Sequence, residues 1–99
     1  MSRNADRVYT APADIAQLEA RIAQLPDDAR VELGLRDGGT LRGVVAARPT
    51  LQSFYGPGDE EGFNGVLRLE LAGGGLRDLW LDEIETVRAL TATELDRPG

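Results

Sequence analysis

The chain has 99 residues with 11 basic and 17 acidic side chains, which give a net charge of −6. It contains no cysteine and no histidine, which excludes disulfides, thiolate chemistry, zinc and haem ligation, and Ser-His or Cys-His catalysis. The acidic balance opposes non-specific binding to nucleic acid or to an anionic membrane. This length suits one domain with a modest core, so we expect a single domain over residues 1–99.

No apolar run approaches the roughly 20 residues that span a bilayer, and the first residues lack the apolar core of a secretory signal. We therefore expect a soluble, cytoplasmic protein of bacterial type. All the basic residues are arginine, which forms forked contacts to phosphate and carboxylate. Genomic base composition is the alternative explanation, and we favour it because Gly, Ala, Arg and Leu are abundant throughout.

The N-terminal part predicts one helix. Residues 1–9 are polar and expected to be loosely held, with Val8 and Tyr9 as their points of contact. Thr10 can cap a helix over about 11–25. Apolar residues recur there at spacings of three and four, which leaves one stripe to pack on the end of a β-barrel. The stripe comprises Ile15, Leu18, Ile22 and Leu25.

Residues 30–47 predict a β-hairpin. Apolar side chains alternate along both halves, and Asp37-Gly38-Gly39 between them supplies the positive-φ positions of a tight turn. Gly43 falls on the apolar face of the second strand, where a glycine marks a sharp bend such as a barrel corner. Pro49 interrupts this strand, because proline cannot donate to the ladder. We expect strands at about 30–36 and 40–47.

The rest of the chain predicts three more strands. Residues 50–55 can continue in extended form, and residues 56–62 carry the turn signals of a loop. The tail is polar and expected to fray. The further strands are expected at 65–71, 76–81 and 84–90, and the tail at 91–99. The chain is thus mainly β with one N-terminal α-helix: a small five-stranded antiparallel SH3-like or Sm-like barrel over about 30–90, with loosely ordered termini.

Two segments resemble the Sm motifs. Residues 31–43 carry three alternating apolar positions, an Asp-Gly turn and a strand glycine at the spacing of the first Sm motif. Residues 79–87 lie where the shorter second motif belongs. The whole chain, including residues 48–52 and 61–64, is similar to an uncharacterised bacterial family described as a Sm-like variant. The resemblance implies a Sm-like barrel without an assigned biochemical activity.

Sm and Hfq-type proteins form rings and bind uridine-rich or adenine-rich RNA, so the resemblance also implies where to look for an RNA site. Their third-loop motif aligns with residues 60–64: Asn64 matches the base-contacting Asn and Glu60 stands for the Asp. Gly62 takes the place of the aromatic or His that stacks on the base. The fifth-loop Arg-Gly is replaced by Leu81-Asp82. One matched position of three does not support the RNA site.

Charged clusters have ordinary explanations. The acidic loop at 59–61 holds carboxylates, the only metal ligands available, but it lacks the alternating spacing of a calcium loop. We therefore expect a solvated tip, with neither metal nor cofactor.

Five arginines on one face of the predicted sheet could track phosphates, yet Glu32 and Glu70 share that face and favour cross-strand ion pairs. These arginines are Arg30, Arg36, Arg42, Arg48 and Arg68.

Aromatic residues suggest contact surfaces. Tyr55 and Phe63, with Phe54, flank the long loop and could stack on single-stranded bases or anchor an interface. Trp80 alternates with Asp78, so it faces away from the barrel interior, and we favour a packing or subunit-interface role for it.

Catalysis has the weakest support. Ser53 and the threonines have no His or Lys base, and the triple glycine at 73–75 lacks the Lys-Ser/Thr of a phosphate loop. Our leading hypothesis is a non-catalytic interaction module, a small homo-oligomer that binds a protein partner through a barrel edge and the 54–64 loop. The competing hypothesis is an RNA-binding Sm variant that contacts short single-stranded RNA. Its contacts would be Arg48, Tyr55, Phe63 and Asn64.

Overall fold

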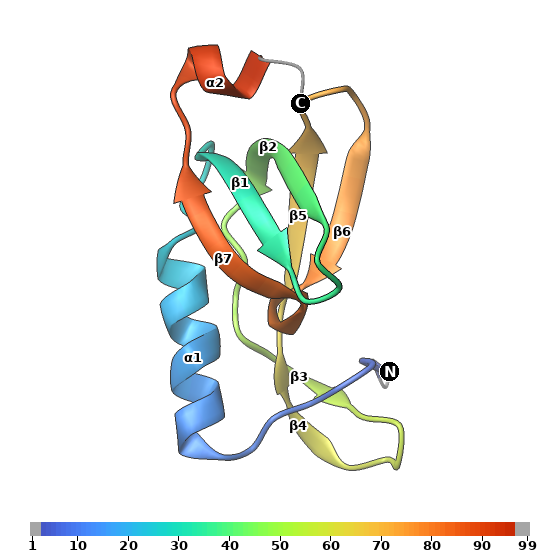
Figure 1. Cartoon of the computed structure of the whole chain (residues 1–99). Coiled ribbons are helices and arrows are strands. Elements are labelled where there is room, and N and C mark those ends of the chain that lie inside the picture. Colours follow the sequence, from blue (N-terminus) through green and yellow to red (C-terminus); the bar gives the residue numbers. More distant parts are fainter. Residues whose placement is uncertain (1–2, 97–99) are drawn as a thin grey trace.

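A computed structural model describes residues 3–96 and shows a curled β-sheet with a helix beside it and a small hairpin below (Figure 1). The elements, in chain order, are α1 (Pro12–Ala23), β1 (Arg30–Leu35), β2 (Thr40–Ala47), β3 (Gln52–Tyr55), β4 (Glu61–Asn64), β5 (Val66–Leu71), β6 (Leu76–Trp80), the short 3₁₀ helix η1 (Leu81–Glu83), β7 (Ile84–Ala89) and α2 (Ala92–Asp96).

Helix α1 forms close to the predicted bounds. Proline suits the first turn because its missing N–H has no intrahelical partner there, and Asp14 is favourable against the helix dipole. The helix N-cap is Ala11 without a side-chain hydrogen bond, so the predicted capping by Thr10 is wrong. Leu18 and Ile22 are buried on one face and join the core, as the apolar stripe predicted.

The β1–β2 hairpin is confirmed, with Gly38 at φ 91° in its turn. The five-stranded sheet runs in the order β6-β5-β2-β1-β7, and every neighbouring pair is antiparallel. Alternate side chains point inward and fill the core, where the side chains with 0% exposure include Leu33, Val45, Leu67 and Leu69. Burial of such side chains supplies the main stabilisation of the sheet.

Gly43 is required by a close approach between β2 and β5. A Cβ built on Gly43 would lie 2.3 Å from the carbonyl oxygen of Glu70, far inside van der Waals contact. The register between these strands shifts between Val45 and Ala47, which bends β2 as the glycine and Pro49 predicted.

The predicted closed barrel is wrong in two respects. The strands form an open five-stranded sheet, with β6 and β7 as its edges, and a separate two-stranded sheet of β3 and β4. The predicted loop at 56–62 is shorter, because β4 already begins at Glu61. Closure depends on whether two edge strands meet in space, and alternation along each strand carries no information about that.

Both termini are more structured than predicted. Residues 3–9, hereafter the N-terminal segment, form β-bridges with the β3–β4 hairpin. Helix α2 forms within the tail that was expected to fray, and residues 1–2 and 97–99 lie outside the described part of the chain. None of the helices within residues 3–96 has the length and apolar character needed to cross a membrane.

Candidate functional site

The β3–β4 hairpin brings together two of the predicted binding residues. Its register places Ser53 opposite Phe63 and Tyr55 opposite Glu61, so these four side chains share one face. Tyr55 is 37% exposed and Phe63 is 38% exposed. The hairpin therefore shows two diagonally placed aromatic rings to solvent, on what we call the outer face of the hairpin.

Asn64 lies on the opposite, inner face of the hairpin and is fully buried. Its side-chain nitrogen donates to the Arg7 carbonyl at 2.9 Å and to the Asp82 carboxylate at 3.1 Å. Its side-chain oxygen accepts a hydrogen bond from the Gly65 N–H at 2.8 Å. The amide is thus engaged inside the protein and joins β4 to η1 and to the N-terminal segment.

Arg48 lies apart from the aromatic rings. It follows β2, and its backbone N–H donates to the Asp27 carboxylate in the connection after α1. Within residues 3–96, no hydrogen bond, ion pair or ring contact joins Arg48 to Tyr55 or Phe63. Of the four predicted RNA contacts, the structure brings only these two aromatic residues to a common exposed surface.

The N-terminal segment runs across the hairpin and pairs with both of its edges (Figure 1). At one edge, Tyr55 donates to the Arg3 carbonyl at 2.7 Å and Ala5 donates to the Tyr55 carbonyl at 2.9 Å. At the other edge, Tyr9 and Phe63 exchange two backbone hydrogen bonds of 2.9 and 2.8 Å. Both edges of this two-stranded sheet are therefore already paired, which leaves its outer face as its open surface.

Two glycines allow the N-terminal segment to cross the hairpin. A Cβ on Gly62 would lie 2.9 Å from the Val8 Cβ, and a Cβ on Gly56 would lie 3.0 Å from the Val8 Cγ2. Val8 is half-buried in this position, and so is Tyr9, as predicted for the docking residues. A larger residue at Gly62 would push the segment away, because its Cβ would also lie 3.0 Å from the Tyr9 carbonyl oxygen. At Gly56, by contrast, the new Cβ would first meet the Glu60 side chain at 2.3 Å.

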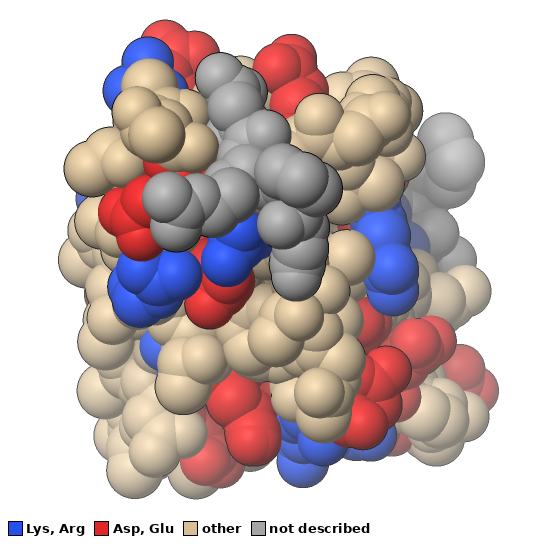
Figure 2. All heavy atoms as spheres, turned by 45° about the horizontal axis from the view of Figure 1, so that its top comes forward, with Lys and Arg blue, Asp and Glu red and all other residues tan. Residues whose placement is uncertain are grey.

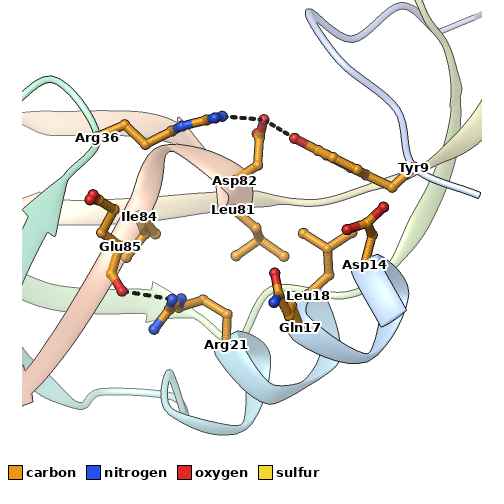
Figure 3. A pocket seen from close by; sticks show the side chains of 10 residues that line it. All are labelled: Tyr9, Asp14, Gln17, Leu18, Arg21, Arg36, Leu81, Asp82, Ile84 and Glu85. Carbon is orange, nitrogen blue, oxygen red and sulfur yellow. Dashed lines mark hydrogen bonds and ion pairs between the residues drawn. The ribbon is translucent and has the colours of Figure 1, made fainter. Parts of the chain in front are cut away.

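Asp82 receives polar contacts from the N-terminal segment and from Arg36 at the end of β1, and Figure 3 shows those made by Tyr9 and Arg36. Its carboxylate, 12% exposed, accepts a 2.8 Å hydrogen bond from the Tyr9 hydroxyl and lies 3.7 Å from the guanidinium groups of Arg7 and Arg36. Burial, together with the hydrogen bond to Asp82, raises the pKa of Tyr9 to about 12. The phenol is therefore held protonated and acts as a donor.

A cleft of about 320 Å³ lies between α1, η1 and the start of β7 (Figure 3). Its floor is apolar, with Leu18, Leu81 and Ile84, and its rim mixes acidic and basic groups. Arg21 at this rim donates to the Glu85 carbonyl at 2.8 Å. Within the part of the chain that is described, no group of three or more acidic side chains is placed to hold a metal ion.

Trp80 links the hairpin to the large sheet. Its ring meets Phe54 edge to face, with centroids 5.2 Å apart and planes at 89°. The Arg3 guanidinium lies 5.0 Å from the centroid of the same Phe54 ring. Trp80 is half-buried on the outer side of β6, so part of it packs within the chain and part faces solvent.

The β5–β6 ladder determines which backbone groups of β6 point outward. Leu81 donates to the Gly65 carbonyl at 2.9 Å, so hydrogen-bonded pairs recur at every second residue of this ladder. The intervening residues turn their N–H and C=O groups away from β5. These residues are Leu76, Asp78 and Trp80. Within residues 3–96 no strand pairs with them, and Leu76 is 60% exposed.

The arginines on the outer face of the sheet act mainly in ion pairs. Arg42 lies 2.7 Å from Glu32 directly across neighbouring strands, which confirms the predicted cross-strand pairing with Glu32. Arg68 also forms a cross-strand pair, at 3.1 Å, but its partner is Asp78, which was not predicted. The hydrogen bond from Arg42 holds the pKa of Glu32 below its ordinary value. Among the coloured atoms of the face seen in Figure 2, blue basic and red acidic side chains lie beside one another.

Sequence reasoning missed the polar cluster around Asp82. Tyr9 and Arg7 reach it from the N-terminal segment and Arg36 reaches it from the end of β1, and a contact between residues 9 and 82 leaves no local pattern in the chain. Helix α2 did leave a pattern. Thr91 and Glu94 form a reciprocal capping box, with hydrogen bonds of 3.2 and 3.1 Å, and the Thr-x-x-Glu spacing is its signature.

Comparison with known proteins places this arrangement in a family. Residues 2–90 match the family described as Domain of unknown function (DUF3247). The chain belongs to this family. The structure is also similar to that of XC5848 from Xanthomonas campestris, described as adopting a novel variant of the Sm-like motif, with a TM-score of 0.86 and 36% sequence identity. The match covers 92% of this chain and 100% of XC5848. No protein with a curated description matches.

The DUF3247 chain therefore has a Sm-like fold, as the two sequence motifs indicated. The positions that align with the RNA-contacting loops of Sm proteins are brought together here, because Asn64 of β4 hydrogen-bonds Asp82 of η1. In this chain the side chains at the two positions form a hydrogen bond with each other.

Proposed function

We propose that this protein is a non-catalytic Sm-like module that binds protein through the open edge of β6 and the outer face of the β3–β4 hairpin, with a second copy of itself as its first partner. The observation that carries the proposal is the row of backbone groups at Leu76, Asp78 and Trp80, with which no strand of residues 3–96 pairs, beside the exposed Leu76 side chain. An open strand edge is a template for pairing with another chain.

The exposed apolar side chains support the same surface. Leu76 and Val66 lie on the β5–β6 side of the sheet, at 60% and 37% exposure, and Tyr55 and Phe63 lie on the hairpin. Trp80 packs against Phe54 on the inner face of the hairpin, and this contact fixes the hairpin against the β6 side of the sheet. Aromatic and aliphatic side chains around an open edge are typical of protein interfaces.

The described site chemistry offers little to an enzyme. Tyr9 is the side chain with the largest pKa shift, and the shift is upward, away from a nucleophile at neutral pH. The carboxylate beside it, Asp82, is held by two arginines and two hydrogen bonds. These contacts hold η1 in place and commit the Asp82 carboxylate to a structural role.

RNA binding is the weaker alternative. Tyr55 and Phe63 could stack on bases, and they are the one observation in its favour. The buried Asn64 is committed to internal hydrogen bonds, and Asp82 places an acid where Sm proteins have a cation. The net charge of −6 adds long-range repulsion from phosphates.

Light scattering with size-exclusion chromatography tests the proposal. The monomer mass is 10.7 kDa, and we expect the protein to elute with a larger mass. Asp78→Pro removes an outward N–H from the edge and no bond of the β5–β6 ladder, so it should give a folded monomer. Asp78→Ala is the matched control, because it removes the same side chain and keeps the N–H. A monomeric wild-type protein at high concentration would contradict the proposal.

A further inference from the structure

The two open edges of the large sheet differ in which side chains accompany their free backbone groups. On β6 the residues whose backbone N–H and C=O groups point away from the sheet are Leu76, Asp78 and Trp80. Their side chains alternate with that of the buried Leu79 and so lie on the outer face of the sheet. The same reasoning applies to β7, where Leu90 donates to the Arg30 carbonyl at 2.8 Å.

By this alternation, the outward backbone groups of β7 belong to Val87 and Ala89. These residues stand opposite the buried Leu33 and Val31, so their side chains lie on the inner face of the sheet. The β7 edge is also partly covered, because Arg21 of α1 donates to the outward carbonyl of Glu85 at 2.8 Å.

Directly opposed residues of neighbouring strands turn their side chains to the same face of a sheet. An edge whose outward residues lie on the outer face therefore matches another edge of the same kind. When two β6 edges pair, the opposed side chains lie on the outer face of both sheets, so the two outer faces form one continuous surface. When a β6 edge pairs with a β7 edge, outer side chains of one sheet oppose inner side chains of the other, so the outer faces are not continuous.

We propose that two copies of this chain pair antiparallel along β6, about a two-fold axis at Asp78, and so join their five-stranded sheets into one continuous sheet. This inference rests on the proposed function and names its partner and geometry. In this register Leu76 stands opposite Trp80 of the partner copy, and Asp78 stands opposite its own equivalent.

The side chains of the two outer rows are complementary. A groove of about 260 Å³ lies at Trp80, lined by Val66 on the neighbouring strand and by Glu83 of η1, among others. In the proposed pair, Leu76 of the partner copy lies directly opposite Trp80 on the outer face. Its side chain, which is 60% exposed in the single chain, is then covered by the indole ring. The two-fold axis produces this contact twice.

The central row carries charges. The two Asp78 carboxylates face each other across the axis, and each is paired with its own Arg68 at 3.1 Å. Across the four strands the side chains are therefore Arg68 and Asp78 of one copy, then Asp78 and Arg68 of the other. Their net charge is zero, although the two central carboxylates repel each other. We expect Asp78→Asn to lower the dimer dissociation constant several-fold, because it removes the like-charge contact and keeps the backbone pairing.

Cysteine cross-linking tests the geometry, and the absence of native cysteine makes it clean. Hydrogen-bonded antiparallel partners have Cα atoms about 5.5 Å apart, within the range that a disulfide spans. With a mild oxidant, Asp78→Cys should form a covalent dimer on a non-reducing gel. Arg77→Cys, one residue away on the other face, is the control and should stay a single chain because its counterpart is not opposite.

The outcomes separate this inference from the proposed function. If light scattering shows an oligomer but Asp78→Cys does not cross-link, or Arg77→Cys cross-links equally fast, the two-fold pairing at Asp78 is wrong and self-association stands. If light scattering shows a monomer at all concentrations, both fail. Selective cross-linking at position 78, together with a dimer mass, establishes the proposed pairing.

Discussion

The side-chain amide of Asn64 donates a 3.1 Å hydrogen bond to the carboxylate of Asp82, 18 residues further along the chain. This bond joins the β4 strand to η1, the two places where Sm proteins hold a nucleobase according to the sequence resemblance. The same carboxylate also receives the Tyr9 hydroxyl. The contact thus turns a position associated with ligand binding into a structural junction of hairpin, sheet and N-terminal segment.

Asp82→Ala should destabilise the fold substantially. It leaves the buried Asn64 amide short of an acceptor and removes the counter-charge of Arg7 and Arg36. Loss of a charged hydrogen-bond partner at a mostly buried site costs about 2–3 kcal/mol. Urea unfolding followed by circular dichroism measures this change.

Glu85→Ala is the control for that measurement, because Glu85 is exposed and uses only its backbone carbonyl in a described hydrogen bond. We expect it to change the unfolding free energy by less than about 0.5 kcal/mol. Equal effects of the two substitutions would show that the Asp82 contacts contribute nothing to stability.

Tyr9 should make stability depend on pH in the alkaline range. Its pKa rises from 10.0 to about 12 in the folded protein, so the folded state keeps the proton longer than the unfolded chain. The contribution is complete below pH 10 and is lost as pH rises towards 12. Thermal unfolding at several alkaline pH values should therefore show a decline in wild type that Tyr9→Phe lacks. An identical decline in both would contradict the assignment.

Gly43→Ala should destabilise the protein by about 2 kcal/mol or more, because overpacking against a backbone atom cannot be relieved by a side-chain rotation. The new Cβ would meet the Glu70 carbonyl oxygen at 2.3 Å. Gly73→Ala is the matched control, since a Cβ there has nothing within 4 Å. Urea midpoints measured for both variants decide whether β2 and β5 approach this closely.

We expect that short single-stranded RNA does not bind to this protein at low or at moderate salt. Fluorescence anisotropy with labelled uridine-rich and adenine-rich oligonucleotides, at low and moderate salt, is the appropriate measurement. We expect no change in anisotropy at micromolar protein. Salt-sensitive binding that disappears in a Tyr55→Ala, Phe63→Ala double variant would instead support the RNA alternative and assign it to the outer face of the hairpin.

Local patterns in the sequence predicted the parts of the fold that local physics determines. The Asp37-Gly38-Gly39 turn, the inward alternation around Leu33 and the apolar stripe of α1 were all recovered in the structure. The Sm-like fold also followed from two short motifs. Each of these depends on spacing within a single element or between neighbouring ones.

The remaining features depend on contacts between distant segments. Whether β6 meets β7, and whether residues 3–9 pair with the hairpin, is settled by packing that no periodicity encodes. Asn64 is the clearest case in the candidate site, since its alignment with a ligand-binding position says nothing of its burial. The capping box of α2 is different, because Thr91 and Glu94 carried a readable signal.

The N-terminal segment has a consequence for how the protein is made. Residues 3–9 leave the ribosome before any of β3 or β4 exists, yet their backbone partners are Tyr55 and Phe63. At ordinary rates of synthesis, about 5–20 residues per second, the segment waits several seconds for them. During that interval the segment lacks these backbone partners, so it docks only after both strands of the hairpin have been made.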